Sequence, residues 1–110
     1  MSKHKSLDDV RSYVGRIAQR NGWKLHSNFD ETLDLLVEGL QANFNRLGYF
    51  NCPCRDSRED KMLDRDIICP CDYAKPDIEE FGHCYCALFF KPSFDFTKSI
   101  GMIPERRPEA

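Results

Sequence analysis

Apolar residues recur at helical spacing in the first half of the chain. From residue 7 to residue 18 they stand three and four positions apart, which predicts an amphipathic helix with one face toward a core. Ser6 is a suitable N-terminal cap, and the Asn21-Gly22 pair is a stop signal. The pattern therefore predicts a first helix that ends near Arg20.

A second helical pattern follows with a wider apolar face. It begins at Asn28, because Asn28 and Glu31 have the spacing of a capping box, and it ends before Gly48. Its apolar positions are Phe29, Leu33, Leu36, Val37, Leu40, Phe44 and Leu47. Such spacing is typical of a packing surface rather than of a ligand site.

The sequence pattern changes after Gly48, where short polar segments separate three cysteine pairs. Good helix formers predict a helix over 56–64, and Pro76 predicts the first position of another helix that continues to Phe81. The apolar run 87–90 is compatible with a strand or a buried turn. Residues 103–110, with two prolines, predict a loose tail.

Length and charge bound the classes of protein that the chain can belong to. At 110 residues with 41% apolar content it is predicted to form a single domain, with a core over about 6–102. The net charge is −2 and the two signs are interleaved, so no nucleic-acid partner is expected. No apolar stretch is long enough for a membrane span or a secretory signal, which predicts a cytoplasmic protein.

All six cysteines lie in three Cys-x-Cys pairs, Cys52-Pro53-Cys54, Cys69-Pro70-Cys71 and Cys84-Tyr85-Cys86. In a reducing compartment such a cluster indicates metal binding or redox chemistry rather than a disulfide scaffold. A four-coordinate centre takes four thiolates, so two cysteines remain that could pair with each other. The count predicts a metal centre plus a separate dithiol.

The one-residue spacing bears on which centre this is. In extended backbone the two Cα atoms of a pair are about 6–7 Å apart, at the edge of what a disulfide spans, so each sulfur more readily takes a partner elsewhere. Zinc knuckles usually have two or more residues between their cysteines, which favours an iron-sulfur centre. An all-cysteine zinc site and a set of plain disulfides remain alternatives.

The order of Cys-Pro-Cys, Cys-Pro-Cys and a third Cys-x-Cys followed by Ala-Leu-Phe resembles the catalytic (beta) subunit family of ferredoxin:thioredoxin reductase. The resemblance spans residues 49–90 and implies a small, mainly α domain with irregular cysteine-bearing loops folded around one [4Fe-4S] cluster. Carried over by position, it implies a redox-active disulfide between Cys54 and Cys86. The implied cluster ligands are Cys52, Cys69, Cys71 and Cys84.

This chain departs from the plant and cyanobacterial pattern in three places. The spacer 55–68 is shorter, the spacer 72–83 is longer, and Tyr85 replaces the histidine of Cys-His-Cys. That histidine is associated with proton transfer at the disulfide. His83 is a candidate replacement because its ordinary pKa suits proton exchange with a thiol. Tyr85 is interpreted either as a hydrogen-bond donor to sulfur or as a packing residue.

The resemblance implies ferredoxin-dependent reduction of a protein disulfide in two one-electron steps through a mixed disulfide. Ferredoxin is the implied donor, a thioredoxin- or glutaredoxin-like protein the substrate, and a variable subunit a further partner. Basic residues that could steer an acidic ferredoxin are Arg55, Arg58, Lys61, Lys75 and Lys91. The alternatives are an iron-sulfur electron-carrier module without disulfide turnover and a zinc-stapled interaction domain.

Overall fold

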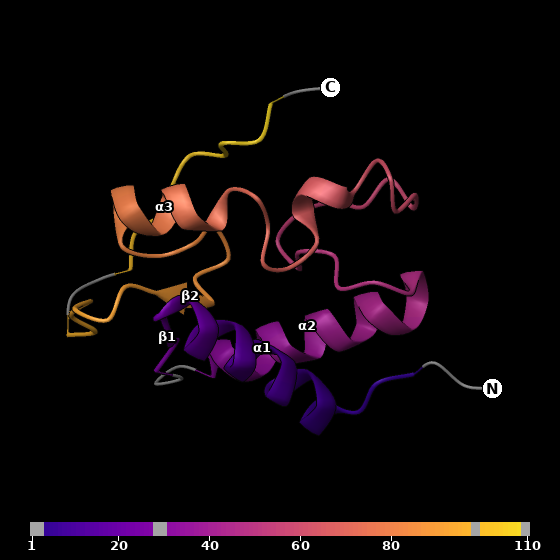
Figure 1. Ribbon diagram of the computed structural model, residues 1–110, viewed down its shortest axis with the longest axis horizontal. Helices are drawn as coiled ribbons and strands as arrows, with labels where there is room; N and C mark the ends of the chain where they lie inside the picture. The colour runs from indigo at the N-terminus through magenta and orange to yellow at the C-terminus, as the bar shows by residue number, and fades with distance from the viewer. Residues whose placement is uncertain (1–3, 28–30, 98–99, 109–110) are drawn as a thin grey trace.

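Three α-helices, one 3-10 helix and two short strands form the described part of the chain, residues 4–27, 31–97 and 100–108 of a computed structural model. In chain order they are α1 (Leu7–Asn21), β1 (Lys24–Leu25), α2 (Thr32–Leu47), η1 (Arg65–Ile67), α3 (Ala74–Phe81) and β2 (Phe89–Phe90). Figure 1 shows α1 lying across α2 and α3 standing apart from both, with the strands between them. A small helical domain with cysteine-rich loops is thus confirmed, with a small sheet added.

The first predicted helix is confirmed as α1. Ser6 Oγ accepts a hydrogen bond from the Asp9 N–H at 3.1 Å, and Asp9 Oδ2 accepts one from the Ser6 N–H at 3.0 Å, which makes a reciprocal capping box. Gly22, at φ 71°, ends the helix in the left-handed conformation that glycine adopts without strain. The face predicted to be apolar is the one that α1 buries.

The second helix is confirmed, but it starts later than its sequence suggests. The predicted cap, Asn28, and the apolar Phe29 lie outside the described residues. α2 begins at Thr32, after Glu31 in a left-handed conformation at φ 64°. Gly48 ends the helix by donating its N–H to the Phe44 carbonyl oxygen at 2.7 Å.

The predicted helix over 56–64 is wrong, because side chains there take the backbone N–H groups that a helix would use. Asp60 Oδ1 accepts hydrogen bonds from the N–H groups of Met62 and Leu63. The buried Asp64 carboxylate accepts from the Arg58 N–H at 3.0 Å, and also from Ser57 and Tyr49. The segment therefore forms turns around Asp64.

Replacing Asp64 with asparagine should lower the free energy of unfolding by about 1–3 kcal/mol, because buried donors lose a charged acceptor. Burial alone would raise the pKa of the Asp64 carboxyl, but hydrogen bonds from Ser57, Tyr49 and the Arg58 N–H lower it below 3.8. This contribution is present above pH 4 or so and is lost as pH falls through the folded-state pKa. Urea unfolding from pH 3 to pH 7 measures it, with the exposed Asp60→Asn as the matched control. Equal losses in both variants would contradict this role.

The later elements are close to their predicted positions. α3 starts at Ala74, so Pro76 is its third residue rather than its first, a place in the first turn where no intrahelical partner needs its missing N–H. The apolar run 87–90 divides into a turn, with Ala87 at φ 58°, and strand β2. Each strand has only two residues, and β1 pairs antiparallel with β2.

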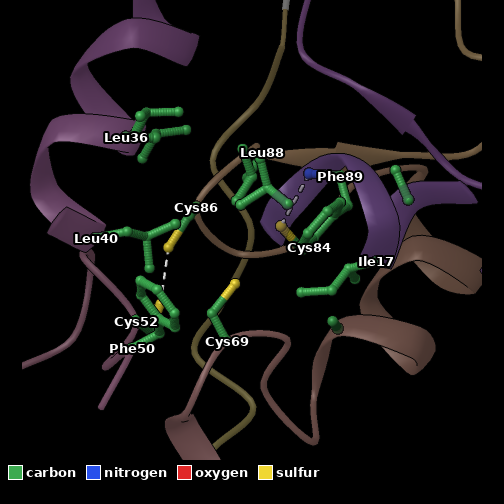
Figure 2. Packing of buried hydrophobic residues seen from close by; sticks show 14 of the residues in the cluster. Ile17, Leu36, Leu40, Phe50, Cys52, Cys69, Cys84, Cys86, Leu88 and Phe89 are labelled. Atoms are coloured by element: carbon green, nitrogen blue, oxygen red, sulfur yellow. Dashed lines mark hydrogen bonds between the residues drawn. The ribbon is translucent and has the colours of Figure 1, made fainter. Parts of the chain in front are cut away.

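The core joins the helices to the cysteine loops. The Phe50 ring stacks on Tyr13 of α1 at 4.2 Å between ring centroids and contacts Phe44 of α2 at 4.6 Å. Figure 2 shows Leu36 and Leu40 of α2 in the same buried cluster as the cysteine side chains. The first two helices therefore share one hydrophobic core with the cysteine loops.

Candidate metal and redox centre

The first two cysteine pairs lie side by side because their backbones are hydrogen-bonded. Cys52 donates its N–H to the Ile67 carbonyl oxygen at 2.8 Å, and Cys69 donates to the Phe50 carbonyl oxygen at 2.7 Å. Asn51 and Ile68 form an antiparallel bridge between the two segments. The hydroxyl of Tyr13 donates to the Cys69 carbonyl oxygen and links this pair to α1.

A tight turn brings the third pair to the same place. Cys84 donates its N–H to the Phe89 carbonyl oxygen at 3.0 Å, and Ala87 donates to the Cys84 carbonyl oxygen at 2.9 Å. The Phe89 N–H points back at Cys84 Sγ at 3.4 Å. An N–H aimed at sulfur is typical of thiolates that bind metal, where it stabilises the negative charge.

Cysteines from all three pairs line one cavity. Its walls are mainly apolar, and Leu88 and Phe89 form part of them. Its cysteine lining comprises Cys52, Cys69, Cys71, Cys84 and Cys86. In Figure 2 the side chains of Cys52, Cys69, Cys84 and Cys86 gather in this space, with Leu40, Leu88 and Phe89 around them.

The sixth cysteine differs from the rest. Cys54 is exposed, Cys71 is half-buried and the other four are buried. Cys86 Sγ lies 2.8 Å from Cys52 Sγ, and a hydrogen bond with Cys86 also lowers the pKa of Cys54, against the effect of burial. The structure therefore places Cys86 between a buried and an exposed thiol.

The thiol pKa values separate into two groups. Burial, reinforced by the charges of Cys84, Cys52 and Cys71, raises the pKa of Cys69, and burial raises that of Cys84 to about 11. The hydrogen bond from Cys86 lowers the pKa of Cys52 to about 7, and the Cys86 pKa rises because that thiol donates to Cys52 and Cys54. Buried thiols of this kind become thiolates when a cation compensates their charge.

Arg55 places a positive charge beside two of these sulfurs. Its Nη1 donates to Cys71 Sγ at 3.2 Å and to Cys52 Sγ at 3.7 Å. Burial alone would lower the Arg55 pKa, but hydrogen bonds to Glu105 and the charges of Cys71 and Cys52 raise it. Arg55 is 8% exposed and ion-paired with Glu105, so the structure buries it, and its role in steering ferredoxin stays a prediction. The other four basic candidates are exposed.

His83 lies in an aromatic cluster rather than at a sulfur. It is 4% exposed, its Nδ1 is 2.8 Å from the Cys84 carbonyl oxygen, and its ring contacts Phe90 and Phe94. Within the described residues no hydrogen bond joins His83 to a cysteine sulfur. Tyr85 packs its ring against the Arg55 guanidinium at 4.5 Å.

The predicted loose tail has no helix or strand in its described part, but its charged residues are ion-paired to the body. Glu105 pairs with Arg55, Arg106 with Asp77, and Arg107 with Asp66. Sequence reasoning missed these contacts because Arg55 and Glu105 are fifty residues apart. The signal available was an arginine directly after the first Cys-Pro-Cys.

Glycine at position 39 allows the first Cys-Pro-Cys to approach α2. A Cβ there would lie 3.0 Å from Pro53 Cβ, a tighter contact than most Cβ atoms make, so Pro53 would have to shift by a few tenths of an ångström. Gly39→Ala should therefore lower the free energy of unfolding by about 1–3 kcal/mol through overpacking. Gly15 of α1, with nothing within 4 Å of such a Cβ, is the matched control, and Gly15→Ala should add about 0.5–1 kcal/mol. Equal gains in both variants, measured by urea unfolding, would contradict the close approach.

A small helical domain whose loops enclose a set of buried thiols, with one further thiol exposed at the edge, belongs to the class of cysteine-rich metal and redox proteins. The family model for the ferredoxin thioredoxin reductase catalytic beta chain matches residues 1–104. The chain belongs to this family.

Curated relatives have the same description at modest identity. The chain is 30% identical over 95 residues to a chloroplastic ferredoxin-thioredoxin reductase catalytic chain of Oryza sativa subsp. japonica, covering 84% of this chain and 62% of the rice chain. It is 29% identical over 98 residues to the catalytic chain of Porphyra purpurea, covering 86% and 78%. For the Cyanidium caldarium chain, identity is 26% over 102 residues, covering 90% and 86%. The chain thus spans less than two thirds of the rice relative.

Two kinds of feature are absent from the described residues. No helix there is both long and apolar enough to span a bilayer. No group of three or more His, Cys, Asp or Glu side chains there gathers in the way that would hold a single metal ion.

Proposed function

We propose that this chain is a ferredoxin-dependent disulfide reductase, in which four cysteines hold a [4Fe-4S] cluster and Cys54 and Cys86 form the redox-active pair. The observation that carries the proposal is the position of Cys86, buried 2.8 Å from the ligand candidate Cys52 and hydrogen-bonded to the exposed Cys54. Family membership supports it independently. The ligands would be Cys52, Cys69, Cys71 and Cys84.

The residues around the cavity fit such a cluster. Thiols from three separate loop segments face an apolar cavity, an arrangement that suits a polynuclear centre better than a single ion. Hydrogen-bond donors already point at three of the four ligand candidates, from Phe89 to Cys84 and from Arg55 to Cys71 and Cys52. When bound, the cluster supplies one-electron transfer from a donor protein to the disulfide.

The exposed thiol of Cys54 and the buried thiol of Cys86 would carry out different steps of the reaction. The Cys54 thiolate attacks one sulfur of the substrate disulfide, which forms a mixed disulfide and releases the other substrate sulfur as a thiolate. Cys86 attacks Cys54 Sγ, which forms the Cys54–Cys86 disulfide and frees the substrate dithiol. Two electrons, delivered singly by ferredoxin, and two protons restore the two thiols. Cys54 suits attack because it is exposed and its pKa is lowered.

The partners follow from this chemistry and from the names of the relatives. Ferredoxin is the proposed donor, and a thioredoxin- or glutaredoxin-like protein is the proposed substrate. A variable subunit is a further proposed partner, and the cytoplasm, where thiols stay reduced, is the proposed compartment. The role of His83 in proton transfer stays a prediction, which a His83→Asn variant with a slower turnover would support.

Anaerobic purification followed by metal analysis tests the proposal. We expect about four irons and four sulfides per chain with a broad brown absorption. Reduced ferredoxin should then convert a thioredoxin disulfide to its dithiol only in the presence of the protein. A colourless protein that holds zinc and no sulfide would overturn the proposal and leave an interaction domain.

A further inference from the structure

Arg55 occupies one edge of the thiol cavity in a fixed orientation. Its side chain is 3% exposed, and one guanidinium nitrogen faces both Cys71 Sγ and Cys52 Sγ. The aromatic rings of Tyr85 and Tyr73 lie 4.5 and 5.3 Å from its Cζ. The guanidinium therefore has little freedom to turn away from the sulfurs.

Glu105 holds the other edge of the same guanidinium. Arg55 Nε donates to Glu105 Oε2 and Arg55 Nη2 donates to Glu105 Oε1, each at 2.6 Å. This two-bond arrangement fixes the plane of the guanidinium as well as its position. Nη1 is then left to face the cysteines, so one arginine is shared between a carboxylate and two thiols.

The two residues after Glu105 are ion-paired to α3 and to η1. Arg106 bonds Asp77 at 2.8 Å and Glu80 at 2.6 Å, both on α3. Arg107 bonds Asp66 in η1 at 2.9 Å and the Leu63 carbonyl oxygen at 3.1 Å. We call residues 105–107 the C-terminal strap. The family model matches residues 1–104, so its match ends just before the strap.

We propose that the C-terminal strap is part of the cluster site, because Glu105 positions Arg55 to donate to the Cys71 and Cys52 thiolates. This inference rests on the proposed function, since those thiolates are proposed cluster ligands. Donors to ligand sulfurs typically change metal affinity by about 10- to 100-fold. A positive charge beside the sulfurs also favours the reduced, more negative state of a cluster. Arg55 is thus a positioning and tuning residue.

Iron release tests the strap. The full chain and its Glu105→Gln variant are loaded anaerobically and mixed with a ferrous chelator, and the rate of iron loss is followed by absorbance. We expect Glu105→Gln to lose iron about 10-fold faster than wild type. Glu59→Gln is the matched control, because it removes the exposed pair with Arg46 at 3.1 Å, and its rate should stay within about 2-fold of wild type.

The midpoint potential separates tuning from a merely structural role. Arg55→Gln removes the positive charge and should shift the midpoint potential of the cluster to more negative values. Arg55→Lys keeps the charge, so its midpoint potential should stay close to that of wild type. A wild-type protein that holds no iron would overturn the proposed function and this inference with it. Equal rates of iron release from wild type and Glu105→Gln would overturn the role of the strap alone. A midpoint potential of Arg55→Gln equal to that of wild type would overturn the tuning role of Arg55.

Discussion

Replacing Cys54 with serine should abolish disulfide reduction and leave the iron content unchanged. Cys54 is exposed and does not line the cavity that five other cysteines enclose, so its loss removes no proposed ligand. A serine hydroxyl cannot form the mixed disulfide, and removing a nucleophile typically lowers turnover by about 1,000-fold or more. Ferredoxin-driven reduction of thioredoxin measures the loss, and iron and sulfide analysis measures the retained cluster.

Cys86→Ser is the informative partner variant. Cys54 can still attack the substrate disulfide, but no second thiol is present to release it, so a covalent complex with the substrate should accumulate. Mass spectrometry under non-reducing conditions detects that complex, which should be missing from Cys54→Ser. Turnover by Cys54→Ser at the wild-type rate would instead support an electron carrier whose Cys54 and Cys86 do not cycle.

The helical part of the fold could be predicted from local signals. The Ser6 cap, the apolar spacing and Gly22 together define α1 within one residue, because each acts over a single turn. Gly48 likewise ends α2. The start of α2 was not predicted, because Glu31, the residue before the helix, adopts a left-handed conformation that no sequence motif indicates. Local rules succeeded where the interactions they describe are themselves local.

The segment 56–64 shows why the same reasoning failed elsewhere. Its composition favours a helix, but Asp64 bonds Tyr49, fifteen residues earlier, and also takes the Arg58 N–H. Helix propensity differs by only a few tenths of a kcal/mol per residue, so one buried carboxylate with several donors outweighs it. Such long-range contacts leave no periodic trace in the sequence.

The candidate site likewise has a part that the sequence predicts and a part that depends on long-range contacts. The cysteines and their likeness to a known family were visible in the sequence, since a metal or redox centre needs particular residue types. The partner of Arg55 was not, because a glutamate in a polar tail looks like any solvated charge until the fold places it 2.6 Å from the guanidinium. The burial of Arg55 and its contacts with two cysteine sulfurs were consequently not predicted.

Cys69→Ser should remove the cluster and destabilise the loaded protein. Cys69 is 6% exposed, and the charges of Cys84, Cys52 and Cys71 all act on it, so it lies among the other proposed ligands. In the metal-free state the variant should lose only about 1–3 kcal/mol, the cost of burying a hydroxyl. In the loaded state the loss should reach about 5 kcal/mol or more, because the free energy of cluster binding contributes to folding.

Comparing the two states isolates the cluster from the side chain itself. Urea unfolding of wild type and Cys69→Ser, each before and after anaerobic loading, gives four free energies of unfolding, and iron analysis gives the occupancy. Only loaded wild type should be strongly stabilised, since ligand binding stabilises the state that binds it. A Cys69→Ser protein that keeps four irons per chain and gains the same stability on loading would remove Cys69 from the ligand set. The division of the cysteines into four ligands and one redox-active pair would then need a different fourth ligand. Cys86, whose Sγ is 2.8 Å from Cys52 Sγ, is the alternative among the buried thiols.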